Sequence, residues 1–324
     1  MKVTKRQFGK KTGFTIIELL TVMSIIIILI SVLVPGLNLA RRYAKRVKQK
    51  AQFHSISVAM EQFSALNQSV GYPESGLLPV PPVAQFTTGA QRLAEALMGR
   101  DRRGYDPQSS WDAQADSVAL NAATIYASST YAPAGTPAEV ADSLDRRKGP
   151  YLPDVAAFQV RELYGAVGNV YLGPDVGNPT VKPAPVLTDE YTVKNVTVGG
   201  KAVKAGSPVL YYKANSSTVF PDTSGGGVIA ITPADADASR INSLDNEELI
   251  ALGTVKSGVS VLHHFDPAYT DPGTLKNGRQ IFYEAITNPQ MTPSWPYNQD
   301  SYILISAGFD GIYGTTDDVF NFGE

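Results

Sequence analysis

One long apolar segment dominates the hydrophobic pattern near the start of the chain. From Phe14 to Val34 the sequence reads FTIIELLTVMSIIIILISVLV, with a single charge at Glu18. A helix of this length, at about 1.5 Å per residue, spans the ~30 Å hydrocarbon core of a bilayer. The run is longer than the apolar part of a secretory signal, and Asn38-Leu39-Ala40 is a poor signal-peptidase site. We therefore expect a transmembrane helix over residues 14–35.

An amphipathic continuation is predicted over residues 36–66. Pro35 removes one helical hydrogen bond, so we expect a bend or local loosening there. Apolar residues then recur at a helical period and form a stripe that we expect to lie against the rest of the protein: Leu37, Ala40, Ala44, Val47, Ala51, Ile56, Ala59, Met60, Phe63 and Leu66. Six basic residues are expected to face water, with binding to lipid headgroups as the alternative: Arg41, Arg42, Lys45, Arg46, Lys48 and Lys50.

The remaining residues, 67–324, are predicted to form one head of mixed secondary structure. Residues 77–83 contain three prolines and should be extended. Residues 191–198 and 201–204 flank Gly199-Gly200 and read as a hairpin. Further predicted strands cover residues 209–212, 228–231, 281–286 and 302–306, and predicted helices cover residues 90–98 and 243–252, the latter starting near Asp245. A long helix packed on an antiparallel sheet gives the fold class α+β.

Charge divides the chain into three parts. Residues 1–13 carry five basic side chains and no acid, and six more basic residues follow the apolar run. After Leu66 there are 17 basic and 28 acidic residues, a net charge of −11, so binding of nucleic acid through bulk charge is not expected. Because both flanks of the apolar run are strongly basic, the positive-inside rule does not decide the orientation.

Glu18 is the chemically unusual residue of the apolar run. A charge at the bilayer centre costs roughly 2–4 kcal/mol, so the carboxylate needs compensation. If the chain is cut after Gly13, Phe14 acquires a free amine that can pair with Glu18 of the same or a neighbouring chain. The alternative is that Glu18 lies near the interface and reaches water.

The run Lys10-Lys11-Thr12-Gly13-Phe14-Thr15-Ile16-Ile17-Glu18-Leu19-Leu20 resembles the prepilin signature of type IV pilins and type II secretion pseudopilins. The likeness covers about the first 35 residues: a basic leader, Gly before the scissile bond, Phe after it, Glu at the fifth mature position and Pro35 where the family often has a helix-kinking proline. It implies a leader over residues 1–13, cleavage by prepilin peptidase between Gly13 and Phe14, N-methylation of Phe14 and a role for Glu18 in assembly.

The resemblance also implies a place for the protein in the cell. It predicts a single-pass protein of the bacterial inner membrane, with the leader inside and the head in the periplasm or on the cell exterior. The implied partners are prepilin peptidase, other pilin or pseudopilin subunits, an inner-membrane assembly platform and membrane lipid.

A loop near the C-terminus is a candidate calcium site. Residues 306–318 read SAGFDGIYGTTDD and combine Asp310, Asp317 and Asp318 with three glycines. Calcium prefers six to eight oxygen ligands, and glycines let a backbone turn its carbonyls inward. The spacing is not that of an EF-hand, and taken alone an Asp/Gly-rich loop is more often an ordinary turn. The loop is similar to the calcium loop of major pseudopilins, which implies that Asp310 and Asp317 are ligands, with Asp318 as a third.

Two function classes follow from these patterns. The first is a non-enzymatic filament subunit, of a secretion pseudopilus or, alternatively, of a type IV pilus as a minor pilin. The second is a membrane-anchored binding module or enzyme. Enzymatic motifs give the second little support: there is no cysteine, His263 and His264 are adjacent, and no G-x-S-x-G or phosphate-binding loop is present. By the resemblance, the absence of a cysteine pair and the C-terminal loop favour secretion. The head is larger than that of a typical major subunit, so a tip or low-abundance subunit is as open as the bulk of the filament.

Overall fold

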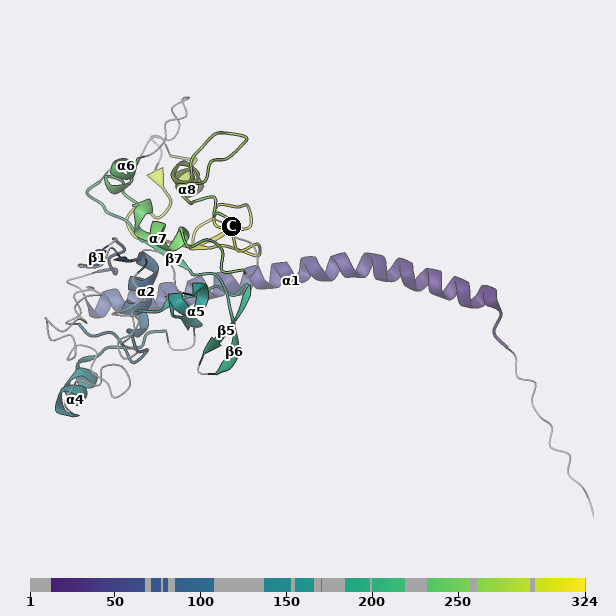
Figure 1. The fold of residues 1–324 in the computed structure, drawn as a ribbon, viewed down its shortest axis with the longest axis horizontal. Helices are drawn as coiled ribbons and strands as arrows, with labels where there is room; N and C mark the ends of the chain where they lie inside the picture. Colours follow the sequence, from purple (N-terminus) through teal and green to yellow (C-terminus); the bar gives the residue numbers. More distant parts are fainter. Residues whose placement is uncertain are drawn as a thin grey trace, which may run out of the picture. The chain divides into compact units, whose positions relative to one another are not determined.

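The computed structural model describes residues 13–67, 71–76, 78–80, 85–107, 137–152, 155–165, 170, 184–198, 200–218, 232–256, 261–291 and 295–323. The chain divides into two compact units, Met1–Lys45 and Arg46–Glu324. Helix α1 (Ile16–Leu66) contributes residues to both, and the second unit is the head (Figure 1). Residues 1–12 of the predicted leader and the predicted strand 228–231 lie outside the described residues.

A three-stranded antiparallel sheet forms the centre of the head. Its strand order is β11 (Val319–Phe320), β10 (Tyr302–Ser306), β7 (Leu210–Lys213). Tyr302 pairs with Lys213 and Ile305 with Leu210 on one side, and Ile305 pairs with Phe320 on the other. Every residue of β10 is buried, so this strand is covered on both faces. Alternation along the strands therefore divides the core into two layers.

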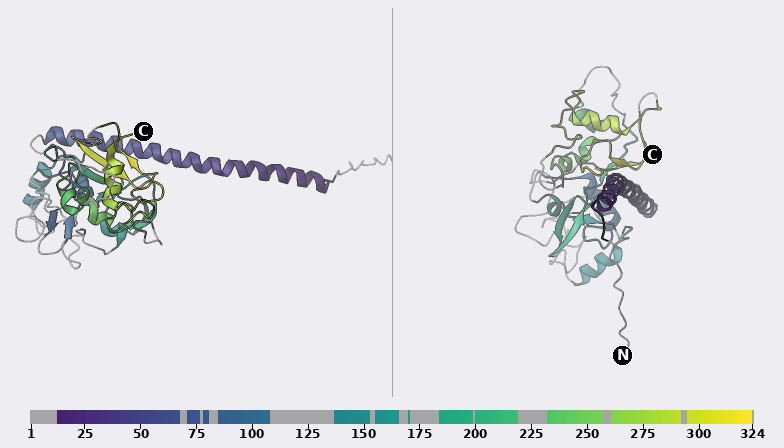
Figure 2. Two further views of the ribbon diagram at one scale, coloured as in Figure 1. Left: turned by 90° about the horizontal axis from the view of Figure 1, so that it is seen from above. Right: turned by 90° about the vertical axis from the view of Figure 1, so that its right-hand side faces the viewer.

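Helices cover the two faces of this sheet. On one face, Tyr211, Tyr302 and Leu304 pack with α1 and with α2 (Gly89–Met98). On the other, Tyr212, Ile303 and Ile305 pack with helices α5 (Val160–Tyr164), α7 (Glu247–Ile250) and α8 (Gly278–Ile286). Figure 2 shows the ribbon from two further directions. The fold class is α+β, as predicted.

Short elements surround this core. They are β1 (Leu78–Val80) with β2 (Gln85–Thr87), β3 (Ala157–Phe158) with β4 (Val186–Leu187), β5 (Lys194–Val198) with β6 (Lys201–Ala205), β8 (Thr287–Asn288) with β9 (Trp295–Pro296), and the helices α4 (Pro137–Arg146), α6 (Pro233–Asp237) and the 3₁₀ turn η2 (Ser243–Asn246). Strands β5 and β6 confirm the predicted hairpin, β7 and β10 confirm two predicted strands, and α2 confirms a predicted helix. Within the predicted extended stretch 77–83, residues 78–80 form β1.

The strand predicted over residues 281–286 is wrong, because these residues belong to α8. Asn277 caps this helix: its Oδ1 accepts a hydrogen bond from Gln280 N at 2.9 Å, and Gln280 Oε1 accepts one from Asn277 N at 2.9 Å. Phe282, Tyr283 and Ile286 then enter the core at helical spacing. A short apolar run fits either a strand or a buried helix, and here the capping box decides.

The prediction of a helix over residues 243–252 is only partly right. The segment forms η2 followed by the single turn α7. Its start is capped by Asn242, whose Oδ1 accepts a hydrogen bond from Leu244 N at 2.9 Å. Asp245 does not cap the helix, and its carboxylate is buried and receives a hydrogen bond from Ser75 instead.

The buried stripe of α1 begins later than predicted. Ile56, Ala59, Met60 and Phe63 are in the core as expected, but Val47, Ala51 and Leu66 are exposed. The stripe starts instead at two glutamines, followed by Phe53. Gln52 donates to Thr188 O at 2.8 Å, and Gln49 accepts from Glu190 N at 2.9 Å. These polar contacts set the rotation of the helix against the head, and apolar periodicity alone does not reveal them.

Candidate processing segment and C-terminal acidic loop

Glu18 lies in the first turn of α1, where it forms a capping box with Thr15. Its Oε2 accepts hydrogen bonds from Thr15 N at 2.8 Å and from Thr15 Oγ1 at 2.6 Å. In return, Glu18 N donates to Thr15 Oγ1 at 3.3 Å. This arrangement satisfies backbone N–H groups that have no partner within the helix. The carboxylate therefore has local partners in the chain as it stands, before any free amine exists at Phe14.

The segment around this cap is apolar and exposed. Gly13 is not helical, and the Phe14 side chain is 82 % exposed. Among the described residues, α1 is the one helix long and apolar enough to cross a membrane, with a mean hydropathy of 2.8 over its most apolar 18 residues and none of that window buried. It is a candidate single membrane span. The helix continues through Pro35, so the expected bend or loosening there stays a prediction.

The acidic loop joins β10 to β11 and turns at three glycines. Gly308, Gly311 and Gly314 have φ angles of 66°, 77° and 92°, in the left-handed region that favours glycine. A Cβ atom at Gly308 would lie 2.4 Å from Asp317 O, and one at Gly314 would lie 2.6 Å from the Cβ atom of His264. The glycines therefore allow the loop both to close on itself and to pack on the neighbouring segment.

The three loop carboxylates mainly bind the loop's own N–H groups. Asp317 Oδ2 accepts hydrogen bonds from Phe309 N at 2.7 Å and Asp310 N at 3.1 Å. Asp310 Oδ1 accepts one from Ile312 N at 2.8 Å, and Asp318 Oδ2 accepts one from Gly314 N at 2.7 Å. Asp318 Oδ1 is buried and has no hydrogen-bond partner among the described residues.

Burial and these hydrogen bonds move the pKa values of the carboxyl groups apart. Burial raises the pKa of Asp318 well above its ordinary value. Burial also raises the pKa of Asp310, to which the neighbouring Asp317 carboxylate adds. At Asp317 burial acts in the same direction, but hydrogen bonds from Thr315 and from backbone N–H groups outweigh it and lower the pKa. Burial thus disfavours the charged forms of Asp318 and Asp310, whereas hydrogen bonds favour the carboxylate of Asp317.

The adjacent histidines contact the acidic loop. His263 is 1 % exposed and its Nδ1 accepts a hydrogen bond from Tyr313 N at 3.1 Å, while His264 N donates to Tyr313 O at 2.8 Å. The His264 ring stacks on Tyr269 with a centroid distance of 4.3 Å. The two rings therefore have separate partners.

The carboxylates meet only part of what calcium requires. Within the described residues no group of three or more His, Asp or Glu side chains converges on one point as metal ligands. Asp310 and Asp317 are neighbours, and the unpartnered Oδ1 of Asp318 has unused capacity to accept. A calcium ion fits this donor set only if backbone carbonyls of the turning loop supply most of the ligands.

Comparison with protein-family models, curated proteins and solved structures finds no match. The functional interpretation of both segments therefore depends on their own residues and geometry.

Two residues that support these segments are not among the predicted site residues. Thr15 had a readable signal, since Thr three residues before Glu at the start of an apolar run is the spacing of a capping box. Asp189 had none. It is buried, its Oδ1 accepts hydrogen bonds from Ser207 N at 3.1 Å and Tyr191 N at 3.2 Å, and its Oδ2 accepts one from Ser306 Oγ at 2.9 Å. It thereby fixes the end of β10 where the acidic loop starts, through a partner 117 residues away.

Proposed function

We propose that this chain is a structural filament subunit of the type II secretion pseudopilin kind, anchored in the bacterial inner membrane by α1. The observation that carries the proposal is Glu18, a carboxylate in the first turn of an exposed apolar helix that begins at Ile16, two residues after Phe14. In the proposal the head lies in the periplasm or on the cell exterior, and the assembly platform and the other subunits are its partners.

The hydrogen bonds between Thr15 and Glu18 are compatible with the proposed cleavage and assembly. Cleavage after Gly13 by prepilin peptidase leaves Thr15 N as an amide, so the hydrogen bonds from Thr15 to Glu18 can persist in the mature chain. The Phe14 amine, methylated or not, is a cation and can form an ion pair with Glu18 of a neighbouring subunit. Because an unpaired charge in a membrane costs roughly 2–4 kcal/mol, such a pair favours assembly over the isolated subunit.

Processing and assembly can be tested in the organism that makes the protein. Mass spectrometry of the membrane-extracted protein should show the loss of residues 1–13 and one added methyl group on Phe14. Glu18→Ala should insert into the membrane and be processed but fail to form filaments, as judged by shearing and sedimentation.

Two variants separate charge from capping. Thr15→Ala removes the capping hydroxyl and leaves the carboxylate, so it should assemble. Glu61→Gln removes an exposed carboxylate further along the same helix and should also assemble, since Gln keeps an acceptor for Tyr72 Oη. A protein that keeps its first 13 residues, or a Glu18→Ala variant that forms filaments, would contradict the proposal. Equal failure of Thr15→Ala and Glu18→Ala would show that helix capping, and not the ion pair, is what assembly needs.

We also propose that calcium stabilises the acidic loop. The adjacent Asp310 and Asp317 and the three turning glycines support this role. Addition of calcium to metal-free protein should raise the melting temperature of the head, and chelation should reverse the effect. Asp310→Asn should lower the response, whereas Asp271→Asn, which changes an exposed carboxylate in another loop, should keep it. An unchanged melting temperature in chelator and in calcium would exclude the site.

A further inference from the structure

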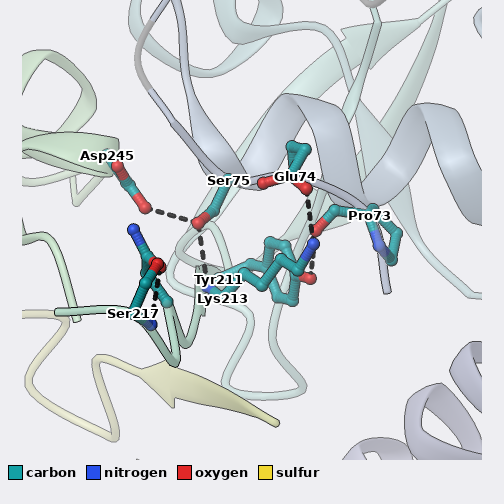
Figure 3. Close-up of polar contacts among 8 residues, drawn as sticks. Pro73, Glu74, Ser75, Tyr211, Lys213, Ser217 and Asp245 are labelled. Atoms are coloured by element: carbon teal, nitrogen blue, oxygen red, sulfur yellow. Dashed lines mark hydrogen bonds and ion pairs between the residues drawn. The ribbon is translucent and has the colours of Figure 1, made fainter. Parts of the chain in front are cut away.

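An open cavity in the head, separate from both segments described above, has the features of a ligand site. Its volume is about 390 Å³, and its wall includes Glu74, Ser75, Lys213, Asp237, Arg240 and Asp245. These residues come from the segment after α1, from the end of β7, and from α6 and its surroundings. Figure 3 shows Glu74, Ser75, Lys213 and Asp245 together with their dashed contacts.

The two cations of the wall already have anionic or carbonyl partners. Lys213 Nζ forms an ion pair with Glu74. Arg240 Nη1 donates to Asp300 Oδ1 at 3.0 Å and Gln299 O at 3.2 Å, and its Nη2 donates to Ser216 O at 3.1 Å. Arg240 Nε is buried and has no hydrogen-bond partner among the described residues, but at the other N–H groups of these two cations an anionic ligand would have to compete with each of these contacts.

Two carboxylates of the wall retain capacity to accept hydrogen bonds. Asp245 is 2 % exposed, and its Oδ2 accepts a hydrogen bond from Ser75 Oγ, which in turn accepts one from Lys213 N at 2.8 Å. Asp245 Oδ1 is buried and lacks a hydrogen-bond partner in the part of the chain that the structure describes. Asp237 is exposed, and its Oδ1 accepts a hydrogen bond from Asn242 Nδ2 at 3.2 Å. The wall thus has spare acceptors and spare negative charge.

We propose that this cavity binds an organic cation through a primary ammonium group, with Asp237 in direct contact and Asp245 stabilising its charge. An ammonium group offers three hydrogen-bond donors and no acceptor. It therefore supplies the donors that the spare acceptors of the wall need. A neutral polyol would not offset the charge of the carboxylates, and the volume suffices for a linear diamine. The same group can arrive as a free amine or as the lysine side chain of a peptide, and the experiment distinguishes these sources.

Protonation of Asp245 should be linked to binding. Burial raises the pKa of this carboxyl to about 7. The hydrogen bond from Ser75 and the positive charge of Arg92 on α2 act in the opposite direction and lower the pKa, but burial outweighs them. Glu74 and Asp237 face it and raise it further, and the hydroxyls of Tyr211, Tyr212 and Tyr283 also lie within electrostatic range. A bound ammonium favours the carboxylate form, so binding releases a proton and should strengthen as the pH rises from 6 to 8.

Isothermal titration of the full-length chain in detergent tests the proposal, with 1,4-diaminobutane as the probe. We expect saturable binding that is several-fold tighter at pH 8 than at pH 6. Asp237→Asn should weaken binding at least tenfold. Asp245→Asn should weaken it and remove the pH dependence, because the amide does not titrate. Glu284→Gln, which removes an exposed carboxylate outside the cavity, should bind as the unaltered protein does.

Two further ligands test the source of the ammonium group and the need for its charge. Binding of acetyl-Gly-Lys-Gly-amide as well as the diamine would identify a lysine side chain as an acceptable source, and binding of the diamine alone would identify a free amine. Equal binding of 1,4-butanediol would overturn the proposal, because it would show that charge is not recognised. Absence of diamine binding, or equal loss in Asp237→Asn and Glu284→Gln, would overturn it too. Since none of these readouts depends on cleavage or assembly, failure here is distinguishable from failure of the filament proposal.

Discussion

Two buried titratable residues of the head respond to pH in opposite directions. The ordinary pKa of His263 is 6.5, and burial lowers it to about 4 in the folded protein. The unfolded chain therefore binds the proton more tightly between these values, and the stability that neutral His263 contributes is lost as the pH falls from 6.5 to 4. Asp245 behaves conversely: its pKa is raised from the ordinary 3.8 to about 7, so the contribution of its protonated form is present at low pH and is lost as the pH rises from 3.8 to about 7.

His263→Asn should isolate the first of these effects. Asparagine keeps an oxygen acceptor for Tyr313 N but does not titrate. We compare the free energy of unfolding of the unaltered protein with that of the variant. We expect the difference to shift against the unaltered protein by about 2 kcal/mol when the pH falls from 7 to 4.5. Chemical denaturation of both proteins at several pH values would measure this. A constant difference across the range would show that His263 does not remain neutral in the folded state.

Among the elements, the acidic loop depends on its glycines for two separable reasons. Gly314→Ala places a Cβ atom at a φ of 92° and 2.6 Å from the Cβ atom of His264, so both backbone strain and a clash result. Gly200→Ala, in the turn of the β5–β6 hairpin, has a φ of 80° and no atom within 4 Å of the added Cβ.

The two alanine variants therefore separate strain from close packing. We expect Gly200→Ala to lower the free energy of unfolding by about 1 kcal/mol and Gly314→Ala by at least twice as much, as measured by denaturation. Similar losses for both would mean that the loop moves away from His264 at little cost.

The individual helices and strands show how much of this fold could be predicted from the sequence. Strand β10 is apolar at four consecutive positions and was predicted, as were α2, β7 and the β5–β6 hairpin with its Gly-Gly turn. For α8, the Asn277 and Gln280 cap was readable but its apolar run also fitted a strand. The rotation of α1 was not predictable, because it depends on Gln49 and Gln52 and on partners more than 100 residues away.

The candidate sites show the same division between local and distant partners. The partner of Glu18 within the chain is Thr15, three residues away, and the sequence contained that signal. Asp245 accepts a hydrogen bond from Ser75, 170 residues away, and Asp189 reaches the start of the acidic loop through Ser306, 117 residues away. Neither the cavity nor the support of the acidic loop could therefore be predicted from the sequence. The polar contacts that position these two carboxylates produce no periodic pattern in the neighbouring sequence.

At the scale of the whole molecule, α1 contributes to two units with different requirements. Up to Lys45 its side chains are mostly exposed, whereas Phe53, Ile56, Met60 and Phe63 are part of the core of the head. Loss of one such side chain to alanine costs about 2–5 kcal/mol, and a domain of this kind is stable by only about 5–15 kcal/mol. We therefore expect the head to require the second half of α1 for folding, whatever the first half does.

Truncation at two points tests this division. A chain that begins at Arg46 should be soluble without detergent and should melt cooperatively at nearly the same temperature as the head of the full-length protein. A chain that begins at Asn67 lacks the four buried apolar side chains and the hydrogen bonds of Gln49 and Gln52, so it should be unfolded or aggregated. Calorimetry and near-ultraviolet circular dichroism distinguish these outcomes. A folded chain that begins at Asn67 would mean that the sheet and α2 form a sufficient core alone, and α1 would then be a separable anchor along its whole length.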